Sequence, residues 1–243
     1  MFFLFPITLM SMPVILLALA AVIPAVVLLI RIYQADRIEK EPPSLILSLL
    51  GLGILSTFCA VITESIGERV ILLLCQEDSF AYRFLMYFVV VALSEEGFKF
   101  LFLKKKTWYN REFNYQFDGI VYAVSVSLGF ALFENLEYVF SYGFSTALIR
   151  AVTAVPGHAC FAVFMGAWYG NARKYIMWNE DEMSRKCLQR ALLVPVLLHG
   201  SYDFVASMGG TLGTILFIAF IAIMFVWSNK VVMREAERDT YIG

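Results

Sequence analysis

Seven apolar stretches, each about 20 residues long, run through this sequence and limit the architectures it can adopt. A helix of that length crosses the hydrocarbon core of a bilayer, where every backbone polar group must be satisfied within the protein. We therefore predict an all-α fold, a polytopic transmembrane helical bundle, organised as one integral-membrane domain over residues 1–243. The predicted spans lie near residues 13–33, 44–63, 84–103, 119–138, 153–173, 188–206 and 212–231.

Composition supports a multi-pass membrane protein. The chain is 60% hydrophobic and 16% charged, whereas soluble domains average about 45–50% and about 25%. Two further apolar pieces, 70–75 and 140–148, are too short to span, and we expect them to lie along the interface or to re-enter. The sequence has no basic tract and no nucleic-acid motif, so no nucleic-acid partner is expected.

The basic residues predict an orientation. Of the 19 Lys and Arg residues, 15 follow the first, third, fifth or seventh span. By the positive-inside rule the N-terminus is then outside and the C-terminus is cytoplasmic. In the first of these basic loops, residues 36–43, a charged run before Pro42-Pro43 is typical of a solvated turn followed by a helix start. The alternative is that this loop packs beneath the bundle.

The third span carries charges where a membrane helix rarely has them, in Ser94-Glu95-Glu96-Gly97-Phe98-Lys99. One such residue at the centre of a membrane helix costs roughly 2.5–3.5 kcal/mol. Glu95 and Lys99 are one turn apart and can form an ion pair. Glu96 points about 100° away, so we expect it not to share the lysine equally, which leaves one carboxylate available for chemistry. The alternative is a purely structural buried ion pair.

Further polar groups lie at similar depth in the next three spans. The fourth contains Glu134 and Asn135, the fifth begins near His158, and in the sixth His199 and Asp203 share one helix face. Counting 1.5 Å per residue places these groups in a column through the outer half of the membrane. The predicted catalytic residues are Glu95, Glu96, Glu134, His199 and Asp203, with Lys99, His158 and Asn135 in support.

Carboxylates and imidazoles in a low-dielectric cavity are suited to activating water. Glu95 could act as the general base without metal. Alternatively, a zinc ion could acidify the water while Glu95 relays the proton, with His199, Asp203, Glu134 and His158 as candidate ligands. Both routes lead to peptide-bond hydrolysis by a membrane-embedded peptidase. Two other classes stay open, a proton-coupled membrane transporter and a non-catalytic membrane scaffold.

Three motifs, in order on separate spans, resemble a known family. Glu95-Glu96-x-x-Lys99, Phe130-x-x-x-Glu134 and His199-x-x-x-Asp203 are similar to the EExxK, FxxxE and HxxxD motifs of the PrsW intramembrane proteases. That family belongs with the CAAX-processing endopeptidases and bacteriocin-processing proteins in one superfamily. The resemblance runs from about residue 21 to residue 204 and includes Asp118-Gly119 and Pro156-Gly157-His158-Ala159.

The resemblance implies a protease of the bacterial plasma membrane that makes the first, site-1 cut in a single-span anti-sigma factor on its extracytoplasmic side. A second protease would then release the sigma factor in an envelope stress response. The resemblance further implies that Glu95 is the base, that Glu96 and His199 are its close partners, and that Glu134 and Asp203 support the site or bind metal. Relatives in the superfamily differ in whether they need metal.

Overall fold

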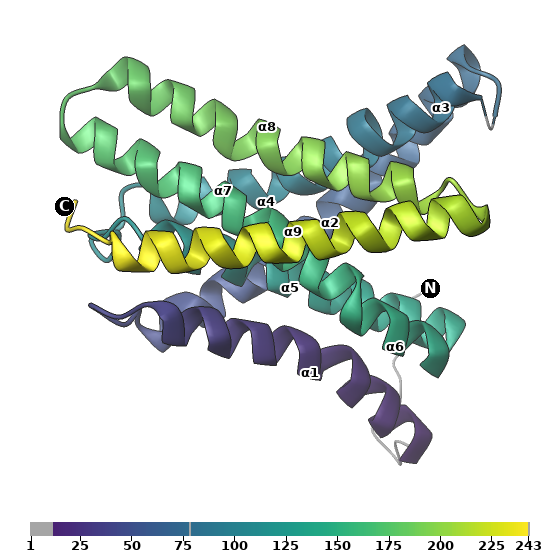
Figure 1. The fold of residues 1–243 in the computed structure, drawn as a ribbon, viewed down its shortest axis with the longest axis horizontal. Helices are drawn as coiled ribbons and strands as arrows, with labels where there is room; N and C mark the ends of the chain where they lie inside the picture. Colours follow the sequence, from purple (N-terminus) through teal and green to yellow (C-terminus); the bar gives the residue numbers. More distant parts are fainter. Residues whose placement is uncertain (1–11, 78, 243) are drawn as a thin grey trace.

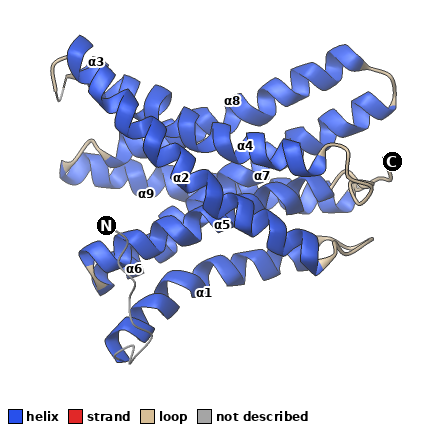
Figure 2. Ribbon diagram, turned by 180° about the vertical axis from the view of Figure 1, so that it is seen from behind, coloured by secondary structure: helices blue, strands red, loops and turns tan. Residues whose placement is uncertain are grey.

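The computed structural model describes residues 12–77 and 79–242, which fold into helices joined by short connections (Figure 1). No strand occurs within those two ranges, and helices account for most of their residues (Figure 2). The all-α prediction is therefore confirmed. The elements are α1 (Met12–Ala35), α2 (Pro43–Leu74), α3 (Phe80–Phe84), the π-helical segment η1 (Leu85–Ala92), α4 (Leu93–Thr107), α5 (Asp118–Tyr142), α6 (Phe144–Val152), α7 (Ala154–Met177), α8 (Asp181–Ala206) and α9 (Gly210–Glu237).

Helix α5 lies at the centre of the bundle. Residues 116–131 are buried without interruption, and α5 packs against α1, α2, α4 and α7. Glycines allow the closest approaches: a Cβ on Gly119 would lie 2.7 Å from the carbonyl oxygen of Gly166 in α7. A Cβ on Gly129 would lie 2.1 Å from the carbonyl oxygen of Leu50 in α2. Small residues are typical of such close contacts between membrane helices.

The outer helices present apolar side chains to their surroundings. On α9, Leu212, Ile218 and Ile223 are 68%, 62% and 66% exposed. Contiguous apolar surface of this kind suits contact with lipid. Five stretches of helix in the described residues are long and apolar enough to cross a membrane: 18–35, 43–74, 118–142, 144–177 and 210–237. The chain is thus a multi-pass membrane protein.

Two predicted spans fall outside that set of five, although both are helical. Residues 84–103 lie in the continuous run α3–η1–α4, and residues 188–206 lie in α8. Both carry the charged side chains that define the candidate site, which lowers their hydropathy. The count of seven spans stays a prediction. One smaller expectation is wrong, because residues 70–75 are no separate piece: α2 runs for 32 residues to Leu74.

One end of the bundle gathers the α1–α2, α4–α5 and α7–α8 connections and the C-terminus (Figure 1). We call it the basic end, because 15 of the 19 Lys and Arg residues follow the helices that finish there. The C-terminal tail pairs with the α4–α5 connection: Ile242 N–H donates to the Asn114 carbonyl at 2.7 Å, and Phe117 N–H donates to Asp239 Oδ1 at 2.8 Å.

The loop before α2 also packs into the basic end. Asp36 and Glu41 are 2% and 3% exposed, so the predicted solvated turn is wrong for these two carboxyls and the packed alternative is correct. Burial raises the pKa of Asp36 to about 6 and that of Glu41 to about 7. The predicted helix start is confirmed, with α2 beginning at Pro43, where proline's missing N–H has no cost.

Candidate active site

A cavity of about 480 Å³ opens among α2, α5, α7, α8 and the end of η1 that leads into α4. Its size is that of an ordinary ligand site. Five residues singled out from the sequence line it together: Glu95, Glu134, His158, His199 and Asp203. Acids and imidazoles from four separate helices therefore share one cavity.

The π-helical segment η1 precedes the acidic pair directly. A π turn is rare and commonly marks a functional position, because it shifts the register of the residues that follow it. Phe88 in η1 packs on Gly200 of α8, where a Cβ would come within 2.4 Å of the phenylalanine ring. This contact holds the start of α4 against α8, and there Glu95 and Glu96 are 6% and 0% exposed.

Lys99 lies at the centre of the polar cluster. Its ammonium donates to Glu95 Oε2 at 3.1 Å, to Glu96 Oε1 at 2.8 Å and to His158 Nδ1 at 3.1 Å. All three of its donors are then used, and the ammonium also lies 3.8 Å from the centre of the Phe130 ring. The expectation that Glu96 would not share Lys99 equally with Glu95 is wrong, since Lys99 donates to both carboxylates and lies nearer to Glu96.

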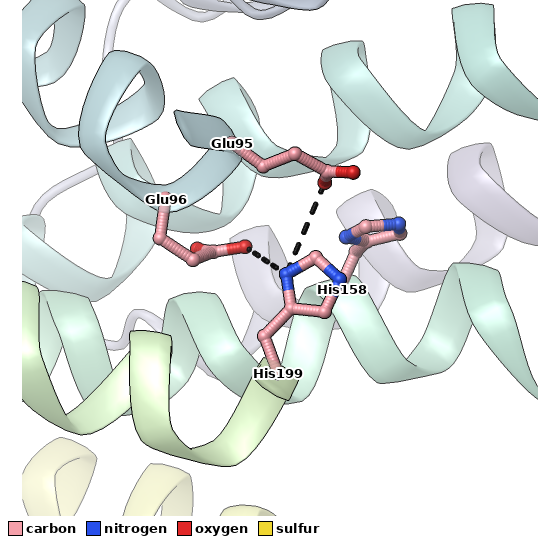
Figure 3. Close-up of side chains that lie close together, drawn as sticks. All are labelled: Glu95, Glu96, His158 and His199. Atoms are coloured by element: carbon pink, nitrogen blue, oxygen red, sulfur yellow. Dashed lines mark hydrogen bonds and ion pairs between the residues drawn. The ribbon is translucent and has the colours of Figure 1, made fainter. Parts of the chain in front are cut away.

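His199 joins α8 to the acidic pair (Figure 3). Its Nδ1 lies 3.0 Å from Glu96 Oε1 and 3.9 Å from Glu95 Oε2. On the other side of the ring, Nε2 lies 3.4 Å from Asp203 Oδ2. Phe161 stacks on the imidazole with ring centres 4.8 Å apart. These contacts fix the ring from both edges and from one face.

His158 forms the second half of the cluster. Because Nδ1 accepts from Lys99, the ring proton is on Nε2, which donates to Glu134 Oε2 at 2.9 Å. Arg150 forms an ion pair with that carboxylate oxygen, its Nη2 lying 2.9 Å away, and its Nε donates to Asn135 Oδ1 at 3.1 Å. Asn135 in turn donates to the Ala21 carbonyl of α1 at 3.0 Å. Asn135 thus ties the site to α1 and lies away from the cavity.

The two adjacent glutamates differ in their surroundings. Glu95 lines the cavity, whereas Glu96 is absent from its lining and is fully buried behind it. Glu96 Oε1 bonds to both Lys99 and His199, and its Oε2 has no partner within the described residues. Of these two glutamates, only Glu95 is therefore placed to reach a molecule in the cavity.

The donor set fits a zinc ion. Glu95, Glu96, His158 and His199 each offer one ligand atom, and these atoms lie within 4.8 Å of one another. Carboxylate oxygens and imidazole nitrogens are ordinary zinc ligands, and Glu96 Oε2 is a buried acceptor without a partner. Lys99 contacts three of the four residues, so an ion here would compete with its ammonium. This set shares both histidines with the sequence-based candidates and has Glu95 and Glu96 in place of Glu134 and Asp203.

Sequence reasoning missed three charged residues that line the cavity, Glu64, Glu137 and Arg150. Glu64 is in α2, one residue beyond the predicted end of that span, so the error in length concealed it. Arg150 lies between the predicted spans 119–138 and 153–173, where no site residue was expected. A carboxylate within the long, mostly apolar stretch 44–74 was the signal that could have identified Glu64.

A model of the PrsW family of intramembrane metalloproteases matches residues 41–228. The chain belongs to that family. It is 34% identical over 188 residues to Protease PrsW of Bacillus subtilis strain 168, which covers 77% of this chain and 81% of the relative. It is 32% identical over 213 residues to Protease PrsW of Clostridioides difficile strain 630, a match that covers 86% of this chain and 87% of the relative. No solved structure is significantly similar to the chain.

Membership in the PrsW family makes the chain an enzyme, a hydrolase that cuts peptide bonds in the membrane. The matched region contains all three sequence motifs and every residue of the cavity cluster described above. The transporter and scaffold alternatives therefore have no support from the comparisons.

Proposed function

We propose that this PrsW family member makes the first, extracytoplasmic cut in a single-span anti-sigma factor and so starts sigma-factor release under envelope stress. The observation that carries the catalytic part is that Glu95 and His199 face one cavity, with His199 Nδ1 3.9 Å from Glu95 Oε2. A water molecule in that cavity can contact both groups at once.

In the proposed reaction, Glu95 takes a proton from this water, and the water oxygen forms a bond to the carbonyl carbon of the scissile peptide. Glu95 then returns the proton to the amide nitrogen as the carbon–nitrogen bond breaks. Glu96 and Asp203 hold the His199 ring in place, and His199 orients the water. Glu134 fixes His158 in the same way on the other side of Lys99.

The residues that would hold a metal are His158 and His199, with Glu95 and Glu96 as the nearest carboxylates. A bound zinc supplies an acidified water and polarises the carbonyl. Hydrolysis by glutamate without metal stays the alternative, because the Lys99 ammonium already pairs with the two carboxylates that a metal would need.

We also propose that the seven spans form one protease domain with the basic end in the cytoplasm and the N-terminus outside. The distribution of basic residues supports this orientation. Glu134 and Asp203 then lie on the outer side of Glu95 and His199, which suits a cut near the extracytoplasmic end of the substrate's membrane segment.

The test is cleavage in proteoliposomes that contain the purified enzyme and a single-span anti-sigma factor from the same organism. Glu95→Gln and His199→Ala should each abolish the cut. Glu68→Gln, which changes an exposed carboxylate on α2, should retain it. Mass spectrometry of the products locates the cut. Cleavage by either site variant at the wild-type rate would refute the assignment, and a cut on the cytoplasmic side would refute the orientation.

A further inference from the structure

Helices α2 and α5 touch through glycines in the half of the bundle nearer the basic end. A Cβ on Gly53 would lie 2.0 Å from the carbonyl oxygen of Val126, and one on Gly129 would lie 2.1 Å from that of Leu50. Only glycines permit so close an approach of two backbones. Past this point, toward the opposite end, larger side chains separate the two helices.

The first such pair is Phe58 of α2 and Phe133 of α5, whose ring centres are 4.7 Å apart at an angle of 52°. Beyond these rings the two helices form the walls of a groove. Its lining residues are Thr57, Phe58, Val61, Ile62, Phe133, Leu136, Glu137 and Phe140.

Most of this lining is apolar and lies open to the surroundings. Phe58, Ile62 and Phe140 are 50%, 63% and 54% exposed. Because α2 and α5 are both long enough to span a membrane, this exposure is toward the bilayer. The groove therefore opens sideways into lipid rather than into water.

The groove is continuous with the catalytic cavity. Thr57, Val61 and Glu137 line both of them. A chain segment lying in the groove would contact these shared side chains, and the cavity that they also line contains Glu95. A substrate that spans the membrane can reach a buried site only from the side, and this groove provides such a route.

We propose that the α2–α5 groove is the docking site for the apolar membrane segment of the substrate and delivers its scissile peptide to Glu95. This inference rests on the proposed function, because it assumes a membrane-spanning substrate. The apolar walls, the lateral opening and the shared lining residues all fit one apolar peptide segment.

The test places a photoreactive benzoyl-phenylalanine at Ile62 in the Glu95→Gln background, where substrate can bind without being cut. The matched control places it at Ile223 of α9, which is 66% exposed against 63% for Ile62. Irradiation should link the substrate's membrane segment to position 62 and not to position 223. Equal linkage at both positions, or linkage at 62 to lipid alone, would overturn the proposal.

A second measurement uses Ile62→Trp and Ile223→Trp in the otherwise wild-type enzyme. Tryptophan at 62 fills the groove, so kcat/KM for the spanning substrate should fall by roughly 10-fold or more through misplacement of the peptide. Tryptophan at 223 should leave it unchanged, and equal melting temperatures exclude misfolding. If wild-type enzyme cuts no spanning substrate, the proposed function fails. If wild type cuts and both variants cut equally, only the groove proposal fails.

Discussion

Glu96 and His199 lie 103 residues apart in the sequence, yet their side chains form a 3.0 Å hydrogen bond in the buried half of the site. Glu95, the neighbour of Glu96, instead lines the cavity. We therefore expect the two glutamates to have different tasks, with Glu96 positioning the imidazole and Glu95 facing the substrate.

The first prediction separates the two glutamates. Glu95→Gln should lower kcat by about 100- to 10,000-fold, the usual contribution of a general base. Glu96→Gln should lower it by only about 10- to 100-fold, because an amide oxygen can still accept from His199. Single-turnover cleavage of the reconstituted substrate measures both. If Glu96→Gln lowered kcat more than Glu95→Gln, the roles of the two glutamates would be the reverse of those proposed.

The second prediction concerns Asp203, which lies 3.4 Å from His199 Nε2. Asp203→Asn removes a charge that holds the ring, so kcat should fall by about 10- to 100-fold while KM stays near its wild-type value. Asp181→Asn, at the exposed start of α8, serves as the control. An effect on KM alone would mean that Asp203 contacts substrate instead.

The third prediction concerns stability. Lys99 bridges two buried carboxylates, and removing one partner from a buried ion pair costs about 3–5 kcal/mol. Lys99→Met should therefore lower the melting temperature in detergent, whereas Lys105→Met, at an exposed position of the same helix, should not. Equal melting temperatures would show that the two carboxylates are not held by Lys99.

The fourth prediction addresses zinc. If the enzyme uses metal, elemental analysis should find about one zinc per chain, and a chelator should stop cleavage. His158→Ala and His199→Ala should lose the zinc, while Cys187→Ala, a buried thiol outside the site, should keep it. Metal-free protein that still cleaves in chelator would establish the glutamate mechanism.

The fifth prediction is a pH dependence of stability at the basic end. Burial raises the pKa of Asp36 from 3.8 to about 6 and that of Glu41 from 4.5 to about 7. Between about pH 4 and pH 7 the folded chain therefore binds more protons than the unfolded chain, so the free energy of unfolding falls as pH rises.

Asp36→Asn should make the protein more stable than wild type at pH 8 and leave it nearly unchanged at pH 4. Glu237→Gln, exposed at the end of α9, should keep the wild-type pH dependence. Thermal unfolding across this pH range measures both variants. A wild-type profile that rises with pH would contradict the pKa shifts.

Much of the fold could be predicted because hydrophobic length and helix geometry are local properties. Apolar runs of about 20 residues identified the helices, and the spacing of four placed His199 and Asp203 on one face of α8. Both features are visible in a single segment. The packed loop at Asp36 was only the alternative expectation, because its neighbours lie far away in sequence: Asn114 of the α4–α5 connection donates to Glu39, and the charge of Asp239 in the C-terminal tail acts on Asp36.

The contacts between helices were also beyond sequence reasoning. The Lys99–Glu96 pair within α4 is different, because residues three apart are neighbours on a helix just as residues four apart are, so helix geometry alone could have predicted it. Arg150 belongs to the short helix α6 and reaches Glu134 only because α6 folds back over the end of α5. Such pairings depend on tertiary packing.

The separation in sequence between the charges of α4 and their partners has a consequence for biosynthesis. His158 leaves the ribosome 59 residues after Lys99, and His199 leaves it 103 residues after Glu96. At translation rates of about 5–20 residues per second, the second delay is roughly 5–20 s. During this time Glu95, Glu96 and Lys99 in the nascent helix α4 can pair only with one another. We expect α4 to stay with the insertion machinery until α8 has been made. Helix α4, part of the third predicted span, would then be among the last to enter lipid.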